Sequence, residues 1–110
     1  MNRTGWITGL LEEKKGEDIV VLTVKSNILV DEFVIATARS KSHLTALAVF
    51  VEQSAKEIGL RTKTDGGPDS EWVVLDFGDV LLHLFTDKMR RMYNLEKLFD
   101  EFNGGTVNGE

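Results

Sequence analysis

Hydrophobic positions dominate residues 72–85, which form two strand-like runs on both sides of a central Gly78-Asp79. If these two residues form the loop of a hairpin, side chains point to opposite faces in turn along each strand. One face is then wholly apolar and is predicted to lie in the core: Val73, Leu75, Phe77, Val80, Leu82 and Leu84. The other face mixes aromatic, aliphatic and titratable groups: Trp72, Val74, Asp76, Leu81, His83 and Phe85. A buried face would not normally combine these groups, so we expect the second face to be exposed and to dock another macromolecule.

Helical periodicity marks two segments before the hairpin. Residues 4–15 place apolar side chains at helical spacing and end before Gly16, which predicts a short amphipathic helix. A longer stripe predicts the main helix, and its members are Leu44, Leu47, Ala48, Val51, Ala55 and Ile58. Ser40 or Ser42 is suited to cap its start, and Gly59 can take the left-handed position after its last turn.

Three further runs are typical of β-strands. Residues 19–24 form a continuous β-branched and aliphatic run, which predicts an interior strand covered on both faces. Residues 33–38 form a second apolar run. Residues 60–64 are more polar, and we expect them at a sheet edge, where charges discourage unwanted pairing.

The end of the chain predicts one more helix and a tail. Thr86 or Asp87 can cap a helix with Met89, Met92, Leu95, Phe99 and Phe102 on one side. The predicted order is helix, two strands, helix, three strands, helix. This order favours a single small α/β domain, a mixed five-stranded sheet flanked by helices. We assign the domain to residues 1–102 and expect residues 103–110, rich in glycine and asparagine, to be a disordered tail.

Composition narrows the class of protein. The 110 residues are 42% hydrophobic and 28% charged with one proline, which is typical of a soluble globular domain. The chain has no cysteine, no apolar run that could span a membrane and no signal-peptide pattern, so we expect a cytoplasmic protein. Its net charge of −5 argues against a broad electrostatic hold on nucleic acid and favours a basic protein partner.

Candidate catalytic or metal-binding groups are sparse. Asp76-Phe-Gly78 matches the magnesium-binding triplet of protein kinases, but the chain lacks a glycine-rich phosphate loop and a His-Arg-Asp catalytic loop. Aspartate and glycine also favour tight turns, and we assign the triplet to the hairpin. The alternative is a divalent cation held by Asp76 and Asp79 with Asp31 or Asp65. We predict no metal, no cofactor and no catalytic residue.

The histidines and the start of the main helix also permit a chemical role. His43 and His83 lack the partner residues of a zinc site or a catalytic triad. Arg39-Ser-Lys-Ser-His43 could bind a phosphate, because helix starts attract anions through free backbone N–H groups. Ordinary serine capping beside solvated basic side chains is the favoured interpretation.

Several blocks of the chain occur together at ordered spacings. They are Asp31-Glu-Phe-Val-Ile-Ala-Thr37, Ser40 with His43, Glu71-Trp-Val-Val-Leu-Asp-Phe-Gly-Asp-Val80, His83-Leu-Phe85 and Arg91-Met-Tyr-Asn-Leu-Glu-Lys-Leu-Phe99. Together they resemble the ribosomal silencing factor family, also called Iojap-like proteins. The departures are Ala38 for a usual glycine, Val30 for a usual threonine and Phe99 for a usual tryptophan.

The resemblance implies a fold related to nucleotidyltransferases. It also implies binding to the large ribosomal subunit through ribosomal protein L-fourteen, on the face that meets the small subunit. Such binding blocks subunit joining and represses translation during starvation or stationary growth. Carried over by position, the contact candidates are Trp72, Val74, Asp76, Asp79, His83 and Phe85. For Arg90 or Arg91, Tyr93, Leu95 and Glu96 we expect packing of the last helix.

Two other functions remain open. An assembly factor for the large subunit would use the same surface. A nucleotidyltransferase would place Gly-Ser at a helix start and two acids one residue apart, where metals can grip a triphosphate. This chain has Arg39-Ser40 at the helix start, and Asp76 and Asp79 are three residues apart. We expect no membrane partner and no direct readout of nucleic acid, and a homodimer remains possible.

Overall fold

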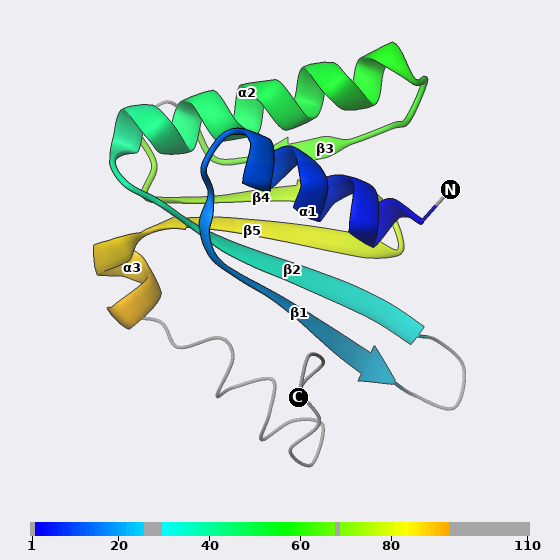
Figure 1. Cartoon of the computed structure of the whole chain (residues 1–110), viewed down its shortest axis with the longest axis horizontal. Helices are drawn as coiled ribbons and strands as arrows, with labels where there is room; N and C mark the ends of the chain where they lie inside the picture. The colour runs from blue at the N-terminus through cyan, green and yellow to red at the C-terminus, as the bar shows by residue number, and fades with distance from the viewer. Residues whose placement is uncertain (1, 26–29, 68, 93–110) are drawn as a thin grey trace.

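The structure is a computed structural model that describes residues 2–25, 30–67 and 69–92. The elements follow the predicted order (Figure 1). They are α1 (Arg3–Glu13), β1 (Glu17–Lys25), β2 (Val30–Ala38), α2 (Lys41–Glu57), β3 (Lys63–Asp65), β4 (Trp72–Asp76), β5 (Val80–Thr86) and α3 (Asp87–Met92).

The described strands form one mixed five-stranded sheet in the order β1-β2-β5-β4-β3, which confirms the predicted fold class. Strands β2 and β5 run parallel, and the other neighbouring pairs run antiparallel. A parallel pair needs a crossover connection, and α2 lies on the path from β2 to β5. This crossover brings two segments far apart in sequence together in the centre of the sheet.

Strand β1 corrects one expectation. Its apolar run is covered on both faces, since Ile19 and Val21 pack on one cluster and Val20 packs on the other. Yet β1 pairs only with β2 among the described strands, so it lies at the sheet edge and not in the interior. A continuous apolar run reports how a strand's two faces are covered and says nothing of its neighbours in the sheet. The polar strand β3 lies at the opposite edge, as predicted, but is confined to Lys63–Asp65.

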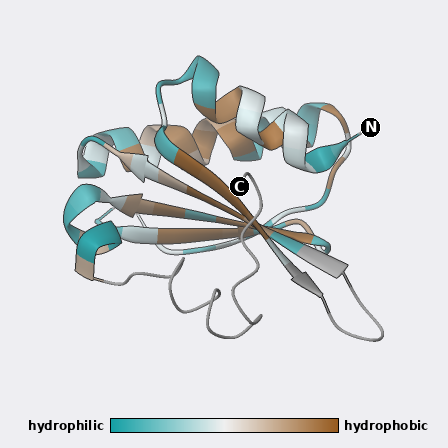
Figure 2. Ribbon diagram, turned by 60° about the horizontal axis from the view of Figure 1, so that its bottom comes forward, coloured by the Kyte–Doolittle hydropathy of each residue, from teal (hydrophilic) through white to brown (hydrophobic). Residues whose placement is uncertain are grey.

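The main core lies between the sheet and the two helices α1 and α2. Figure 2 shows apolar residues concentrated along the strands and in the helices above them. Ile7 and Leu11 of α1 are fully buried there. The apolar face of the hairpin is also buried, as predicted: Val73, Leu75, Phe77, Val80, Leu82 and Leu84. A smaller cluster of Leu22, Ile35 and Phe85 lies on the other side, where Met89 of α3 packs against it.

The helix ends largely follow the predicted signals. Ser40 Oγ accepts a hydrogen bond from His43 N at 3.1 Å, so Ser40 and not Ser42 caps α2. Gly59 takes the left-handed position after α2, with φ of 70°. Lys15, with φ of 63°, takes the corresponding position after α1, ahead of Gly16. Helix α3 starts after Thr86, whose Oγ1 accepts from Met89 N at 3.4 Å.

Most predictions for the end of the chain concern residues that the structure does not describe. Tyr93, Leu95, Glu96, Phe99, Phe102 and the predicted tail all lie outside the described residues. Arg90 does pack as expected, because its Nη1 donates to Thr37 Oγ1 at 2.8 Å. No helix in the described part of the chain is long and apolar enough to cross a membrane.

Candidate protein-interaction surface

The hairpin has the predicted register. Trp72 pairs with Phe85, Val74 with His83 and Asp76 with Leu81. Phe77 N donates to Val80 O at 2.9 Å, which leaves Gly78 and Asp79 as the two loop residues. Gly78 has a φ of 94°, a conformation that glycine adopts without steric cost. A one-residue slip would have exchanged the two faces, so the correct register makes the assignment of each side chain to its face secure.

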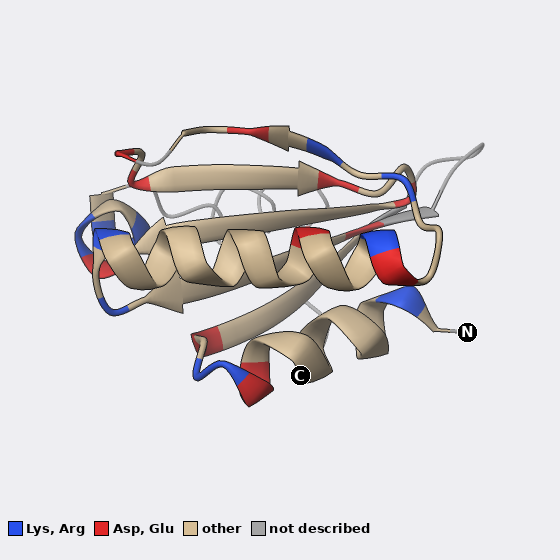
Figure 3. Cartoon of the chain, turned by 90° about the horizontal axis from the view of Figure 1, so that it is seen from above, with Lys and Arg blue, Asp and Glu red and all other residues tan. Residues whose placement is uncertain are grey.

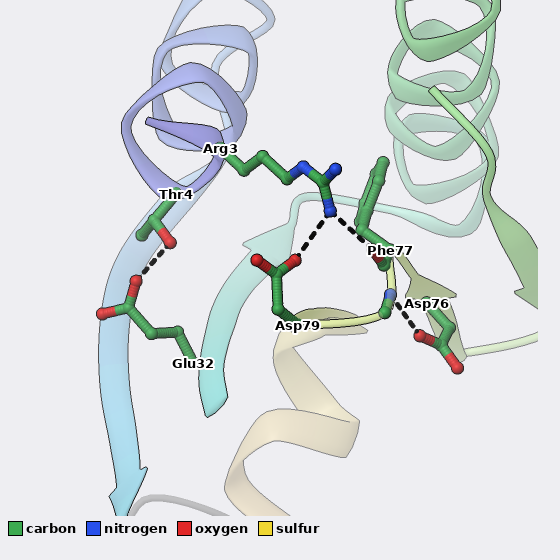
Figure 4. A network of polar contacts seen from close by, with 7 residues as sticks. Arg3, Thr4, Glu32, Asp76, Phe77 and Asp79 are labelled. Atoms are coloured by element: carbon green, nitrogen blue, oxygen red, sulfur yellow. Dashed lines mark hydrogen bonds and ion pairs between the residues drawn. The ribbon is translucent and has the colours of Figure 1, made fainter. Parts of the chain in front are cut away.

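Three side chains hold the loop of the hairpin (Figure 4). Asp76 Oδ1 accepts from Gly78 N at 2.8 Å, a short-range bond typical of aspartate in turns. Arg3 of α1 reaches the loop, where its Nη1 lies 2.8 Å from Asp79 Oδ1 and donates to Phe77 O at 3.1 Å. Asp76 and Asp79 therefore both serve the hairpin, as the sequence suggested.

A second set of polar contacts ties the same end of α1 to β2. Thr4 Oγ1 donates to Glu32 Oε1, and Thr23 Oγ1 donates to Glu32 Oε2 at 3.3 Å. Glu32 N donates to Asp79 O at 3.1 Å. The start of α1, the start of β2 and the hairpin loop thus form one connected polar edge.

Four rings gather on the face of the sheet opposite α1 and α2. Trp72 lies over Phe85, with ring centroids 4.8 Å apart, and His83 stacks beside Phe85 at 6.2 Å. Phe33 from β2 completes the group at 5.9 Å from His83. Three strands contribute to this cluster, and its rings pack on Leu22 and Ile35.

His83 is held as a neutral base inside the cluster. Trp72 Nε1 donates to His83 Nδ1 at 3.1 Å, and an indole N–H can only donate. The proton of the neutral imidazole is therefore on Nε2, which is buried without a hydrogen-bond partner among the described residues. Burial lowers the pKa of His83 from 6.5 to about 4, because the charged imidazolium loses its hydration. The ring is thus uncharged at neutral pH.

Burial corrects the expectation that this whole face is exposed. Phe85 is fully buried and His83 is only 9% exposed. Trp72 covers Phe85 from one side, and Leu22 and Ile35 belong to the same cluster. Trp72 itself is half-buried, so part of its ring remains accessible. We define the outer face as the half-buried side chains that remain: Phe33, Trp72, Val74, Asp76 and Leu81.

Phe33 was missed as a member of this surface. Parallel pairing sets Phe33 opposite Leu81 and Ile35 opposite His83, which brings the Phe33 ring beside the hairpin. Alternation along β2 could have shown that Phe33 and Ile35 share a face. The pairing of β2 with β5 is a long-range contact, and no local pattern in the sequence reports it.

The other candidates have structural roles. His43 Nδ1 accepts from Arg39 N at 2.9 Å and its Nε2 lies 2.8 Å from Lys14 O, so the ring joins the start of α2 to the end of α1. Arg39 Nε lies 3.3 Å from Glu17 Oε2. Within the described residues, no three His, Asp or Glu side chains are grouped so as to hold a metal ion.

Comparisons with known proteins agree on one family. The family model for "Ribosomal silencing factor during starvation" matches residues 3–108. Ribosomal silencing factor RsfS of Halalkalibacterium halodurans is 34% identical over 93 residues, 83% of this chain and 80% of that protein. A crystal structure of a Chromobacterium violaceum protein superposes with a TM-score of 0.79 at 30% identity, covering 94% of this chain and 84% of that one.

A further relative carries a different name. The mouse protein called "Mitochondrial assembly of ribosomal large subunit protein 1" is 31% identical over 98 residues. The match covers 84% of this chain and 43% of the mouse protein.

Proposed function

We propose that this chain, which belongs to the ribosomal silencing factor family, binds the large ribosomal subunit through ribosomal protein L-fourteen and blocks joining of the small subunit. The proposal rests on one observation: on the outer face, the half-buried indole of Trp72 packs over Phe85 and its cluster. We expect this binding to take place in the cytoplasm and to repress translation during starvation or stationary growth.

The indole of Trp72 has the properties of an interface anchor. Its N–H is fixed by His83 and its ring lies over Phe85, so little side-chain entropy remains to be lost on binding. Tryptophan dominates many interfaces where it is well packed. In this proposal the buried side chains of His83 and Phe85 hold the indole in place and do not themselves contact the partner.

Charge supports a basic partner. Asp76 is half-buried beside the hairpin loop, and the chain as a whole carries a net charge of −5. Carboxylates at the rim of an interface steer a basic protein and fix its register. Asp79 already pairs with Arg3 at 2.8 Å, so we expect it to contribute less than Asp76.

The proposed mechanism is steric and requires no catalytic group. A protein seated on the subunit-facing side of the large subunit occupies space that the small subunit needs. A role in large-subunit assembly is the second candidate, supported by the name of the mouse relative. A nucleotidyltransferase activity has less support, because Asp76 and Asp79 are both engaged in the hairpin loop.

The test mixes the protein with separated ribosomal subunits and follows their association by sedimentation. We expect wild-type protein to reduce the yield of full ribosomes. Val74→Glu should abolish the effect, because it places a charge on the outer face while both partners of the Trp72–His83 hydrogen bond stay in the chain. Trp72→Glu should abolish it as well. Ala46→Glu is the matched control, since Ala46 is exposed on α2, which lies on the side of the sheet opposite the outer face.

Circular dichroism and thermal unfolding establish that each variant is folded. Undiminished formation of full ribosomes with wild-type protein would refute subunit blocking. If wild type blocks joining and folded Val74→Glu blocks it equally well, the outer face is the wrong surface. A purified complex with L-fourteen, measured by calorimetry with the same variants, identifies the partner directly.

A further inference from the structure

An open groove of about 890 Å³ lies at the C-terminal end of α2. One wall is the last turns of α2, including Val49 and Lys56. The chain leading into β3 and the hairpin loop complete the groove. It therefore lies on the edge of the sheet where the outer face ends, and Asp76 belongs to both.

Three cations line this groove although the whole chain is acidic. They are Lys56, Arg61 and Lys63, and all three are exposed. Figure 3 shows the corresponding blue segments at the C-terminal end of α2 and along the chain leading into β3. None of the three forms an ion pair or a side-chain hydrogen bond with a described residue. Their charge is thus available to a ligand.

The carboxylates of the groove already have local partners. Glu52 Oε2 accepts from Thr64 Oγ1 at 2.6 Å, and Asp76 Oδ1 accepts from Gly78 N at 2.8 Å. Lys63 is opposite Asp76 across β3 and β4, but the two side chains form no ion pair. The groove is therefore lined by more cationic side chains than carboxylates, and each carboxylate already accepts a hydrogen bond.

The turn after α2 fixes where these cations lie. Leu60 N donates to Ala55 O at 2.9 Å and Gly59 N donates to Lys56 O at 3.1 Å, the bonding pattern of a Schellman motif. Lys56 has a structural explanation, because a cation complements the negative end of the helix dipole. Lys63 has one as well, because a charge on an edge strand prevents pairing with another chain. Neither structural explanation applies to Arg61, which lies after α2 and before β3.

We propose that Lys56, Arg61 and Lys63 form a second contact with the large ribosomal subunit, to phosphates of its RNA backbone. This inference rests on the proposed function. A partner seated on the outer face continues round the sheet edge at Asp76 and meets the groove. Lysine and arginine bind phosphates without reading the base sequence. Three cations in this groove are therefore compatible with an acidic protein that does not recognise a nucleotide sequence.

The test measures binding to isolated large subunits by co-sedimentation over a range of salt concentrations. The groove variant combines Lys56→Gln, Arg61→Gln and Lys63→Gln. The control variant combines Lys15→Gln, Lys41→Gln and Lys88→Gln, which removes the same charge from exposed positions outside the groove. Loss of three phosphate contacts should lower the slope of log affinity against log salt by about two to three in the groove variant only. Its affinity at low salt should fall about tenfold or more.

A second measurement identifies the ligand. Gln53 lines the groove and is uncharged, so a photo-crosslinking amino acid at this position leaves the three cations in place. We expect crosslinks to ribosomal RNA, and crosslinks confined to ribosomal proteins would overturn the inference. Equal salt slopes for the groove and control variants would also overturn it, while leaving the proposed function intact. If wild-type protein fails to bind large subunits at all, the proposed function itself fails.

Discussion

At the scale of single residues, the pair of Trp72 and His83 shows how a polar group is used inside an apolar cluster. The bond from the indole N–H satisfies Nδ1 of the imidazole, but Nε2 has no partner among the described residues. An unmet buried donor is costly, and charging the ring would cost more. The ring therefore stays neutral, and its neutral form is the one that accepts the bond from Trp72.

The first prediction concerns the pH dependence of stability. The pKa of His83 is about 4 in the folded protein and about 6.5 in the unfolded chain, so the unfolded chain binds the proton more tightly. Stability from this group is complete above about pH 6.5 and is lost as the pH falls toward about 4, by about 3 kcal/mol in total. Chemical denaturation across this range measures it. His83→Leu should show a smaller decline over the same range, and an equal decline in both proteins would contradict the assignment.

At the scale of elements, α2 depends on how its start is capped. The sequence offered two serines, and the structure selects Ser40, because its extended backbone lets Oγ accept from His43 N. Ser42 lies inside the first turn, where its hydroxyl is not in the capping position. His43 then links this helix start to the end of α1 through Lys14 O.

The second prediction compares the two serines. Ser40→Ala should lower the free energy of unfolding by about 1 kcal/mol, since a backbone N–H of the first turn loses its acceptor. Ser42→Ala should have an effect close to zero. Urea denaturation of both variants measures the difference, and an equal loss from the two substitutions would show that the cap is misassigned.

At the scale of the whole molecule, α1 closes one side of the fold and contacts distant parts of the chain. Arg3 reaches the hairpin loop, and Trp6 packs edge-on against Phe77 with ring centroids 6.3 Å apart. Leu11 is fully buried in the main core. The ion pair of Arg3 with Asp79 is partly exposed, with 38% and 62% of the two side chains accessible. Apolar burial should therefore hold α1 more strongly than the ion pair does.

The third prediction separates these contributions. Leu11→Ala should destabilise the protein by about 2–5 kcal/mol, because it leaves a cavity in the main core. Arg3→Gln should cost less than about 1 kcal/mol, since exposed ion pairs contribute little. Thermal and chemical unfolding measure both. A larger loss from Arg3→Gln would mean that the polar edge, and not the core, fixes α1 to the sheet.

Local patterns in the sequence predicted most of the fold. Alternation across Gly78-Asp79 gave the hairpin register and the buried face, since strand geometry places successive side chains on opposite sides. The helical stripe predicted α2 and its buried side from Leu44 to Ala55, although the last member of the stripe, Ile58, follows the helix and is 50% exposed. Gly59 takes the predicted left-handed position. These features depend on residues close together in the chain, which is why the order of all eight elements could be stated in advance.

Long-range pairing decided what local patterns could not. The parallel contact of β2 with β5 placed Phe33 in the aromatic cluster, and the same arrangement left β1 at the sheet edge. The sequence determined that Trp72, His83 and Phe85 share a face. Only tertiary packing decided that two of these rings are buried and that Trp72 remains accessible, because burial depends on the neighbouring strand and on α3 as well as on alternation.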